Sequence, residues 1–314
     1  MRDISLILGG GGFVGDYLIR QLTGAGETVH ATKLPQEQIQ AACTVHDLDI
    51  LDSAAVAALL QTLQPARIYH LAAQSSVAVS WKNPQLTVDV NIKGTLNVLD
   101  AVRQLGEQPR ILLIGSGEEY GHVRDGACPI TEEEALHPGN IYAATKACQG
   151  MLGEIYAKAY GMDILCVRAF NHVGPMQAPA FVVSDFCRQA ARIEQGLQPP
   201  VISVGNLSAR RDFTDVRDVV RAYAVLMQHG KSGGVYNVGS GRAVAIQAIL
   251  DEILQLSTAK ITVEQDPARL RPVDVPVIEA DISRLRTDTG WVPEISLTQT
   301  LTDTLAYWRA QSLA

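Results

Sequence analysis

An alternation of apolar, strand-length runs with helix-period segments constrains the fold of this chain more than any other feature, and it covers the first half of the 314 residues. Runs that are apolar throughout predict strands buried on both faces of a parallel sheet, at residues 4–8, 28–32, 67–72, 110–115 and 163–169. Amphipathic segments predict the helices between them, at residues 13–23, 53–63, 84–105 and 141–160. Right-handed crossovers then give an α/β fold with a doubly wound parallel sheet of the Rossmann type.

The alternation weakens beyond Asn171, where Pro, Gly and short strand-like pieces become frequent. This change predicts a smaller α/β lobe in the second half of the chain. We therefore expect a nucleotide-binding Rossmann domain at residues 1–170 and a lobe that mainly binds substrate at residues 171–314. A helix at 216–228, together with a strand in the region 212–240, is expected to return to the first domain.

The composition excludes several classes of protein. The net charge of −7 comes without a basic face, so we expect no nucleic-acid partner. Five scattered cysteines without CxxC spacing predict neither a disulfide framework nor a zinc site, and they fit a reducing compartment. The chain starts without a charged leader, and no run approaches the roughly 18 apolar residues that cross a bilayer. We expect a soluble, cytoplasmic protein without a metal or a membrane partner.

A glycine-rich turn joins the first predicted strand to the first predicted helix. Gly9, Gly12 and Gly15 have GxxGxxG spacing, and Phe13 and Val14 lie between the last two. Glycines let the backbone approach a pyrophosphate, and the helix N-terminus supplies unpaired N–H groups and a positive dipole end. Such a turn also occurs without a ligand, but its place after an N-terminal strand favours dinucleotide binding.

Two places in the sequence bear on the choice of dinucleotide. One is the end of the second predicted strand, and the other follows a further strand region just before Asp49. An NAD site usually has an acidic residue at the end of the second strand, to accept a hydrogen bond from the ribose 2′-hydroxyl. Here Thr32 and Lys33 stand instead, a hydroxyl and a cation that suit a 2′-phosphate. Lys33 is equally compatible with an exposed strand end. Asp49 and Ile50 are expected to bracket the adenine, so NADP(H) is favoured over NAD as the cofactor.

Three residues form a candidate catalytic set. Tyr142 and Lys146 are four residues apart at the start of a predicted helix, so they share one face. A nearby ammonium is expected to lower the pKa of the phenol and make it a usable proton donor or acceptor. A YxxxK pair is common by chance, but Ser116 ends the preceding strand, where doubly wound folds have their sites.

The chain resembles the extended short-chain dehydrogenase/reductase family, in its nucleotide-sugar branch, over essentially its whole length. Within that branch it is most similar to GDP-mannose 4,6-dehydratases and GDP-4-keto-6-deoxy-D-mannose reductases. The motifs that carry the resemblance are GGGGFVG (9–15), HLAAQSSVAVSWKNP (70–84), NIKGT (91–95), GSGEEYG (115–121), YAATK (142–146), RAFNHVGP (168–175), RRDFTDVRD (210–218) and RPVDVP (271–276).

The resemblance implies roles for individual residues. Ser116 hydrogen-bonds the oxygen on carbon 4 of the sugar, Tyr142 exchanges its proton, and Lys146 also holds the nicotinamide ribose. Further cofactor contacts are implied for Leu71, Ala72 and Ala73. Substrate contacts are implied for Ser76, Asn171, Arg211, Arg271 and Asp274, the two arginines being compatible with surface charge pairs as well. By analogy, the helices at 84–105 and 141–160 form the seam of a homodimer.

Residues 116–119 distinguish two reactions of this branch. A 4,6-dehydratase needs a base that removes the proton from carbon 5, and its motif runs Ser/Thr, then Ser or Asp, then Glu. Here the middle residue is Gly117, while Glu118 keeps the position of the base and Glu119 is expected to face away. The motif therefore favours a reductase that delivers hydride from NADPH to a carbon-4 ketone, giving a GDP-6-deoxyhexose of the GDP-rhamnose type. A dehydratase using bound NADP remains the alternative.

Two further observations favour the reductase. The segment after Arg211 reads DFTDV, where dehydratases tend to have Trp-Gly-His, and the loop after the second strand lacks the extension typical of dehydratases. An epimerase with tightly held NAD would be expected to end the second strand with an acidic residue. A non-catalytic nucleotide-binding member of the family usually lacks the Tyr or the Lys, and both are present here.

Overall fold

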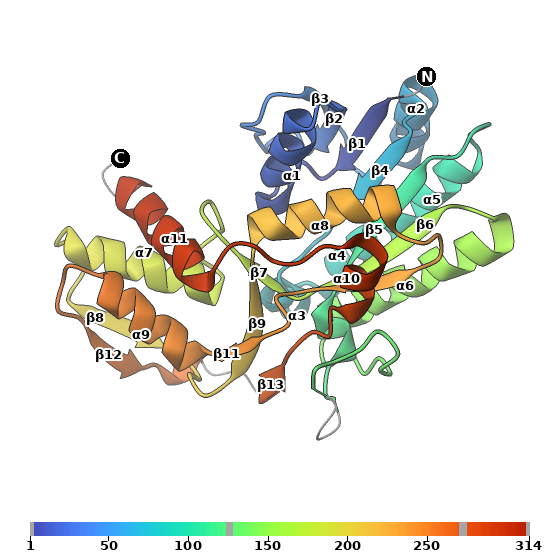
Figure 1. Cartoon of the computed structure of the whole chain (residues 1–314). Helices are drawn as coiled ribbons and strands as arrows, with labels where there is room; N and C mark the ends of the chain where they lie inside the picture. The colour runs from blue at the N-terminus through green and yellow to red at the C-terminus, as the bar shows by residue number, and fades with distance from the viewer. Residues whose placement is uncertain (1–2, 124–127, 270–274, 312–314) are drawn as a thin grey trace.

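A seven-stranded parallel sheet forms the centre of the protein, as the computed structural model shows for residues 3–123, 128–269 and 275–311 (Figure 1). Every neighbouring pair of its strands is parallel. Because the strand order reverses between β1 and β4, a crevice is expected at their carboxyl ends. Across the sheet the strands are β10 (Val235–Val238), β6 (Ile164–Ala169), β5 (Arg110–Ser116), β4 (Arg67–His70), β1 (Ile4–Leu8), β2 (Thr28–Lys33) and β3 (Thr44–Asp47).

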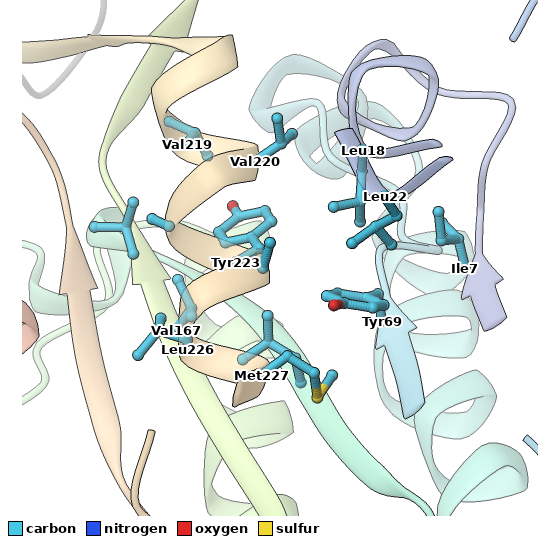
Figure 2. Packing of buried hydrophobic residues seen from close by; sticks show 14 of the residues in the cluster. Ile7, Leu18, Leu22, Tyr69, Val167, Val219, Val220, Tyr223, Leu226 and Met227 are labelled. Atoms are coloured by element: carbon cyan, nitrogen blue, oxygen red, sulfur yellow. The ribbon is translucent and has the colours of Figure 1, made fainter. Parts of the chain in front are cut away.

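Helices cover both faces of this sheet and bury it in two cores. Because side chains alternate along a strand, Ile7 of β1 packs into one core while Leu6 and Leu8 pack into the other. The first core lies under α1 (Phe13–Gly24) and α8 (Val216–His229), and Figure 2 shows its apolar side chains, including Tyr69 and Tyr223, between these elements. The second core is covered by α2 (Ser53–Leu63), α5 (Gly94–Arg103) and α6 (Ile141–Tyr160). The doubly wound α/β fold expected from the sequence is thereby confirmed.

The helix expected at 84–105 is interrupted. It consists of α4 (Pro84–Val88), a π-helical turn η1 (Asp89–Lys93) and α5, and the short helix α3 (Val77–Lys82) precedes it. Within the π turn, Asn91 donates hydrogen bonds to Thr145 Oγ1 and Gln74 O and accepts one from Gln74 N. π turns of this kind often occur near functional sites, and this one ties α6 to the loop after β4.

A smaller lobe follows β6. It has its own core between α7 (Val182–Glu194), α9 (Ile246–Leu256) and α11 (Leu297–Gln311), and Figure 1 shows these helices to one side of the seven-stranded sheet. Its strands form a parallel pair and a small mixed sheet: β8 (Val201–Val204) with β12 (Thr262–Gln265), and β9 (Arg210–Asp215) with β7 (Asn171–Val173), β11 (Ala243–Ala245) and β13 (Val277–Ile278). Short helices η2 (Gly117–Tyr120), η3 (Pro267–Arg269) and α10 (Ser283–Thr289) complete the described chain.

Strand β10 belongs to the large sheet although it follows the first part of the lobe. It pairs with β6 through the register Val235 with Cys166 to Val238 with Ala169. Helix α8, which precedes β10, packs against α1. The chain therefore leaves the seven-stranded sheet after β6, builds part of the lobe, and returns to add a last strand.

Two further properties concern the whole described chain. None of the helices in the described ranges combines the length and the apolar character that spanning a bilayer requires. All five cysteines are unpaired.

Candidate active site

A cavity of about 730 Å³ opens at the carboxyl ends of the central strands, which is a size typical of small-molecule sites. One side is formed by the glycine turn and the ends of β2, β4 and β5. The other side is formed by the lobe, through the start of α7, the loop before β9, and β9 itself. Most residues singled out in the sequence line this cavity.

The glycine turn is built to leave room at the N-terminus of α1. A Cβ on Gly9 would lie 2.6 Å from the backbone of Ala72, and one on Gly15 would lie 2.4 Å from Gly10 O, so neither position tolerates a side chain. Gly12, by contrast, borders the cavity, and a Cβ there would meet nothing closer than 3.7 Å. It is also the N-cap of α1 and provides no side-chain cap. The unpaired N–H groups of the helix are thus left for an anion, which fits a pyrophosphate.

The expected adenosine end of the cavity contains Thr32, Lys33, Asp49 and Ile50. Thr32 Oγ1 accepts a hydrogen bond from Gly9 N at 3.1 Å, which fixes the end of β2 against the glycine turn. Lys33 Nζ forms an ion pair with Asp47 Oδ1 at 2.6 Å. Glu37, which was not among the residues predicted from the sequence, also lines this end.

The residues after β4 divide into two groups. Leu71, Ala72 and Ala73 line the cavity as implied by the resemblance. Ser76 does not line it, because its Oγ caps α3 by accepting a hydrogen bond from Val79 N. Its neighbour Ser75 contributes to the cavity wall instead.

The structure brings Ser116, Tyr142 and Lys146 together at the end of β5. The Tyr142 and Ser116 hydroxyls share a hydrogen bond. Lys146, only 3 % exposed, donates from Nζ to Ile114 O at 2.7 Å and to Gln149 Oε1 at 2.8 Å. All three residues line the cavity beside the glycine turn.

The protonation of Tyr142 differs from the sequence-based expectation. Burial raises the pKa of the phenol, the hydrogen bond with Ser116 acts in the opposite direction, and the carboxylates of Glu119 and Glu118 raise it further. The expected lowering by Lys146 is wrong for this arrangement, because burial dominates. Burial also lowers the pKa of Lys146 to about 8, and Glu119 opposes this change. The raised pKa keeps Tyr142 protonated at neutral pH.

Glu118 and Glu119 point to different sides of the strand end. Glu118 lines the large cavity, and its Oε2 accepts a hydrogen bond from Asn140, the N-cap of α6, at 3.2 Å. Glu119 lies behind the strand, on a separate cavity of about 140 Å³. Its Oε1 accepts from Ser116 N at 2.6 Å, and its Oε2 lies 3.4 Å from Arg168 Nε. Burial raises the pKa of Glu119 to about 7, although Ser116 and Arg168 act against the shift.

The lobe contributes the remaining wall of the cavity. Asn171 of β7 and Arg211 of β9 both line it, and Arg211 is anchored by Nη1 hydrogen bonds to the carbonyls of Arg210 and Val275. Arg271 and Asp274 lie outside the described residues. Sequence reasoning missed several lining residues that only the tertiary structure brings in: His172, which stacks on Phe13, and Phe181, Asp185 and Arg269 of the lobe.

The described residues contain no group of three or more His, Cys, Asp or Glu side chains arranged to hold a metal ion.

Comparison with known proteins identifies the family. Residues 6–304 match the family model described as GDP-mannose 4,6 dehydratase. The chain is 35 % identical to a GDP-6-deoxy-D-mannose reductase of Pseudomonas aeruginosa, with 99 % of each chain covered, and 29 % identical to a GDP-mannose 4,6-dehydratase of Vibrio cholerae, with 97 % and 93 % covered. Its structure is similar to that of RMD from P. aeruginosa complexed with NADPH, with a TM-score of 0.88, 34 % identity, and 98 % and 99 % of the chains covered. The chain belongs to the GDP-mannose 4,6 dehydratase family.

Proposed function

We propose that this protein uses NADPH to reduce the carbon-4 ketone of a GDP-4-keto-6-deoxyhexose, giving a GDP-6-deoxyhexose of the GDP-rhamnose type. One observation carries the proposal. Ser116, Tyr142 and Lys146 lie close together and line the same cavity as the glycine turn. The similarity to a GDP-6-deoxy-D-mannose reductase over 99 % of both chains supports the choice of substrate, and the similarity to the NADPH complex supports the choice of cofactor.

The mechanism follows from the states of the three residues. Bound NADPH supplies the hydride. The Ser116 hydroxyl holds the ketone oxygen, and Tyr142, whose raised pKa keeps it protonated, donates its proton as negative charge develops on that oxygen. Lys146 is fixed by Ile114 and Gln149, and its positive charge favours the phenolate that remains after the transfer. The phenolate then takes up a proton from the solvent, which restores the phenol for the next turnover.

Gly117 supports reduction over dehydration. A dehydratase of this branch has a hydroxyl or carboxyl group at this position to help the carbon-6 oxygen leave. A Cβ on Gly117 would lie 3.1 Å from the ring of Phe170, so a larger side chain could enter only if the ring moved. Phe170 lines the cavity, and its ring occupies the space that a longer side chain at position 117 would need.

Dehydration of GDP-mannose with bound NADP is the second candidate, and Glu118 is the observation in its favour. Its carboxylate lines the same cavity as Tyr142, where the base for carbon 5 would act. Its hydrogen bond with Asn140 is compatible with either a base or a group that only orients the substrate.

The two walls of the cavity support a division of labour. In this proposal, residues 1–170, together with α8 and β10, hold the dinucleotide through Gly9, Gly12 and the ends of β2 to β5. The remaining residues of 171–314 bind the nucleotide sugar, with Arg211 near the diphosphate and Asn171 near the sugar. Arg271 and Asp274 are proposed to contact the nucleoside.

We also propose a homodimer in the cytoplasm. Large apolar side chains are exposed on α4, in the region 84–105, and on α6, and these two helices pack against each other, which suits a four-helix seam between two copies. These exposed residues are Leu86, Val88, Met151, Ile155 and Tyr160. The five free cysteines fit a reducing compartment. Light scattering of the purified protein tests the dimer, and Met151→Glu together with Ile155→Glu should give a monomer.

Two parallel reactions test the function. One contains GDP-4-keto-6-deoxymannose with NADPH, and the other contains GDP-mannose with NADP⁺. We expect oxidation of NADPH in the first and no keto sugar in the second. Formation of the keto sugar would make Glu118 a working base and favour the dehydratase. Turnover in neither tube would reject the GDP-linked substrates.

A further inference from the structure

Helix α6 contributes side chains to both cavities at the end of β5. Lys146 lines the large cavity, whereas Gln149 lines the small cavity of about 140 Å³ behind the strand. Residues three apart on a helix share a face, and Lys146 Nζ donates to Gln149 Oε1 at 2.8 Å. Both residues are buried, with 3 % and 1 % of their surfaces exposed. The contact connects the proposed catalytic set to a residue that does not line the large cavity.

This contact restricts the direction of the lysine's remaining N–H group. An ammonium group has three donors. Ile114 O accepts from one of them at 2.7 Å, and Gln149 Oε1 accepts from another. Because acceptors on β5 and α6 hold two of the three N–H groups, the direction of the third is fixed by tetrahedral geometry. Lys146 lines the large cavity, so this third N–H group is the one that can serve the site.

The amide of Gln149 is oriented for the lysine and not for its own hydrogen bonding. Its oxygen has to face Lys146, because the reversed amide would place two donor groups against each other. In this orientation Nε2 is buried and has no hydrogen-bond partner among the described residues. A buried donor without a partner lowers stability, so an apolar side chain of the same length would suit the packing better. Residues that cost stability in this way are typical of functional sites.

The other groups around Lys146 give its positive charge little support. Burial lowers the pKa of Lys146 to about 8, and the carboxylate of Glu119 on η2 opposes this change. Arg168 of β6 lies beside that carboxylate and offsets its negative charge. Three further titratable groups stay uncharged near neutral pH because burial shifts their pKa values, namely His70 of β4, Tyr142 of α6 and Cys166 of β6. An acceptor in direct contact with the ammonium therefore matters, because it favours the charged form.

We propose that Gln149 is a positioning residue for the reaction, which sets the direction of the Lys146 ammonium and the pH range in which it stays charged. Gln149 does not line the large cavity, so it acts through Lys146. The positive charge that it preserves stabilises the phenolate that Tyr142 becomes after proton transfer. This inference deepens the proposed function and rests on it.

The pH profile of ketone reduction tests the proposal. Gln149→Met keeps the length of the side chain and removes the amide, so we expect the pKa of Lys146 to fall by about one unit. With an ordinary value of about 8 for this protein, kcat then falls about five-fold at pH 8 and less than about two-fold at pH 6. Gln149→Glu places a carboxylate against the ammonium, and its activity should extend about one unit further to alkaline pH than that of the wild type.

Glu154→Gln is the matched control for these variants. Glu154 also borders the small cavity, but its carboxylate pairs with Lys158 on the exposed side of α6. The change alters a charge near the cavity and leaves the contact between Gln149 and Lys146 in place. Its pH profile should therefore match that of the wild type. A shift as large as that of Gln149→Met would replace the specific contact by a general effect of charge.

An NMR titration without cofactor or substrate separates this inference from the proposed function. In protein labelled with carbon-13 at the lysine ε-carbons, the signal of Lys146 is the one that Lys146→Arg removes, and its pH dependence gives the pKa. An unchanged titration in Gln149→Met would reject the role of Gln149 and leave the proposed function standing. A wild-type protein that does not reduce the keto sugar would reject the proposed function, while the titration still decides the role of Gln149.

Urea unfolding distinguishes this role from a purely structural one. Gln149→Met removes the unpaired donor, so its unfolding midpoint should equal or exceed that of the wild type. A lower midpoint, together with the same loss of rate at every pH and no recovery in Gln149→Glu, would show that Gln149 only fills space.

Discussion

The two sides of the end of β5 use the same residue types for different purposes. Toward the large cavity lie Glu118 and Tyr142, and behind the strand lie Glu119 and Tyr120. The hydroxyl of Tyr120 is occupied within the protein, since it donates to Asn237 and accepts from Arg168. The Tyr142 hydroxyl faces a space in which a ligand fits. The type of residue alone therefore does not predict its role. A Glu or Tyr on the cavity side can contact a ligand, whereas the same residue on the other side forms hydrogen bonds within the protein.

Replacing each of the two tyrosines by phenylalanine should give the largest difference in reaction rate between the two sides. Tyr142→Phe removes the proposed proton donor, and the rate of ketone reduction should fall about 10³-fold with little change in NADPH affinity. Tyr120→Phe is the control, and it should keep the rate while lowering the stability by about 1 kcal/mol through its lost hydrogen bonds. Steady-state rates measured beside urea unfolding separate the two effects. Retained turnover in Tyr142→Phe would contradict the mechanism.

Removing the two carboxylates should affect stability on one side only. Glu119→Ala leaves the buried Ser116 N without its acceptor and removes the side chain beside Arg168, so we expect a loss of about 1 to 3 kcal/mol. Glu118→Ala removes a group that is partly exposed, and its cost should stay below about 1 kcal/mol. Urea unfolding of both variants at pH 6 measures the difference. Equal losses would mean that the buried hydrogen bonds of Glu119 contribute little.

The pH dependence of stability sharpens the comparison. The pKa of Glu119 is about 7 in the folded protein, above its ordinary value of 4.5, so the folded state binds the proton more tightly than the unfolded state. Its contribution is fully present below pH 4.5 and is lost as the pH rises through 7, with a size on the order of 3 kcal/mol. Glu119→Gln should flatten the unfolding free energy between these limits, relative to the wild type. A difference profile that does not change with pH would show that Glu119 titrates normally.

The smallest effect is expected for Glu118→Gln. In a reductase the carboxylate is no catalyst, so the rate of ketone reduction should change by less than about three-fold. This amide keeps the size of the side chain and can still accept from Asn140. A drop of more than a hundred-fold in reduction would give Glu118 a catalytic role on the cavity side and revive the dehydratase. The assay is NADPH oxidation with the keto sugar as substrate.

Much of the framework was predictable because strands of a parallel sheet are apolar throughout and its helices are amphipathic. The helices at 53–63 and 141–160 begin and end where expected, and the cavity wall includes the turn at Gly9. A third strand region was expected before Asp49, but the bounds of β3 were not predicted, because it is a short edge strand whose side chains are mostly exposed and lack the apolar pattern. The π turn was missed because its cause, the contacts of Asn91 with Gln74 and Thr145, is tertiary.

The candidate site was less predictable where it depends on loops. Residues at strand ends, such as Ser116, could be found because the sheet fixes their position. Glu37 was missed because no spacing rule tells that the loop after β2 folds back over Gly11. The support that Glu119 gives to Ser116 depends on Gly115, where a Cβ would lie 2.3 Å from Glu119 Oε1, and on Arg168 from another strand. The residues of such a cluster can be read from the sequence, but their contacts cannot be predicted without the tertiary structure.

The return of the chain to the large sheet affects how the protein folds during synthesis and where it can be truncated. Strand β10 covers the edge of β6, and the residues that provide it come about 65 positions later, after part of the lobe. A fragment ending at residue 170 would therefore expose the unpaired N–H and C=O groups of β6 as a template for other chains. During synthesis the seven-stranded sheet cannot be completed before Val238 has been added, and long-range parallel pairings of this kind form slowly. We therefore expect the large sheet and the lobe to fold together as one unit.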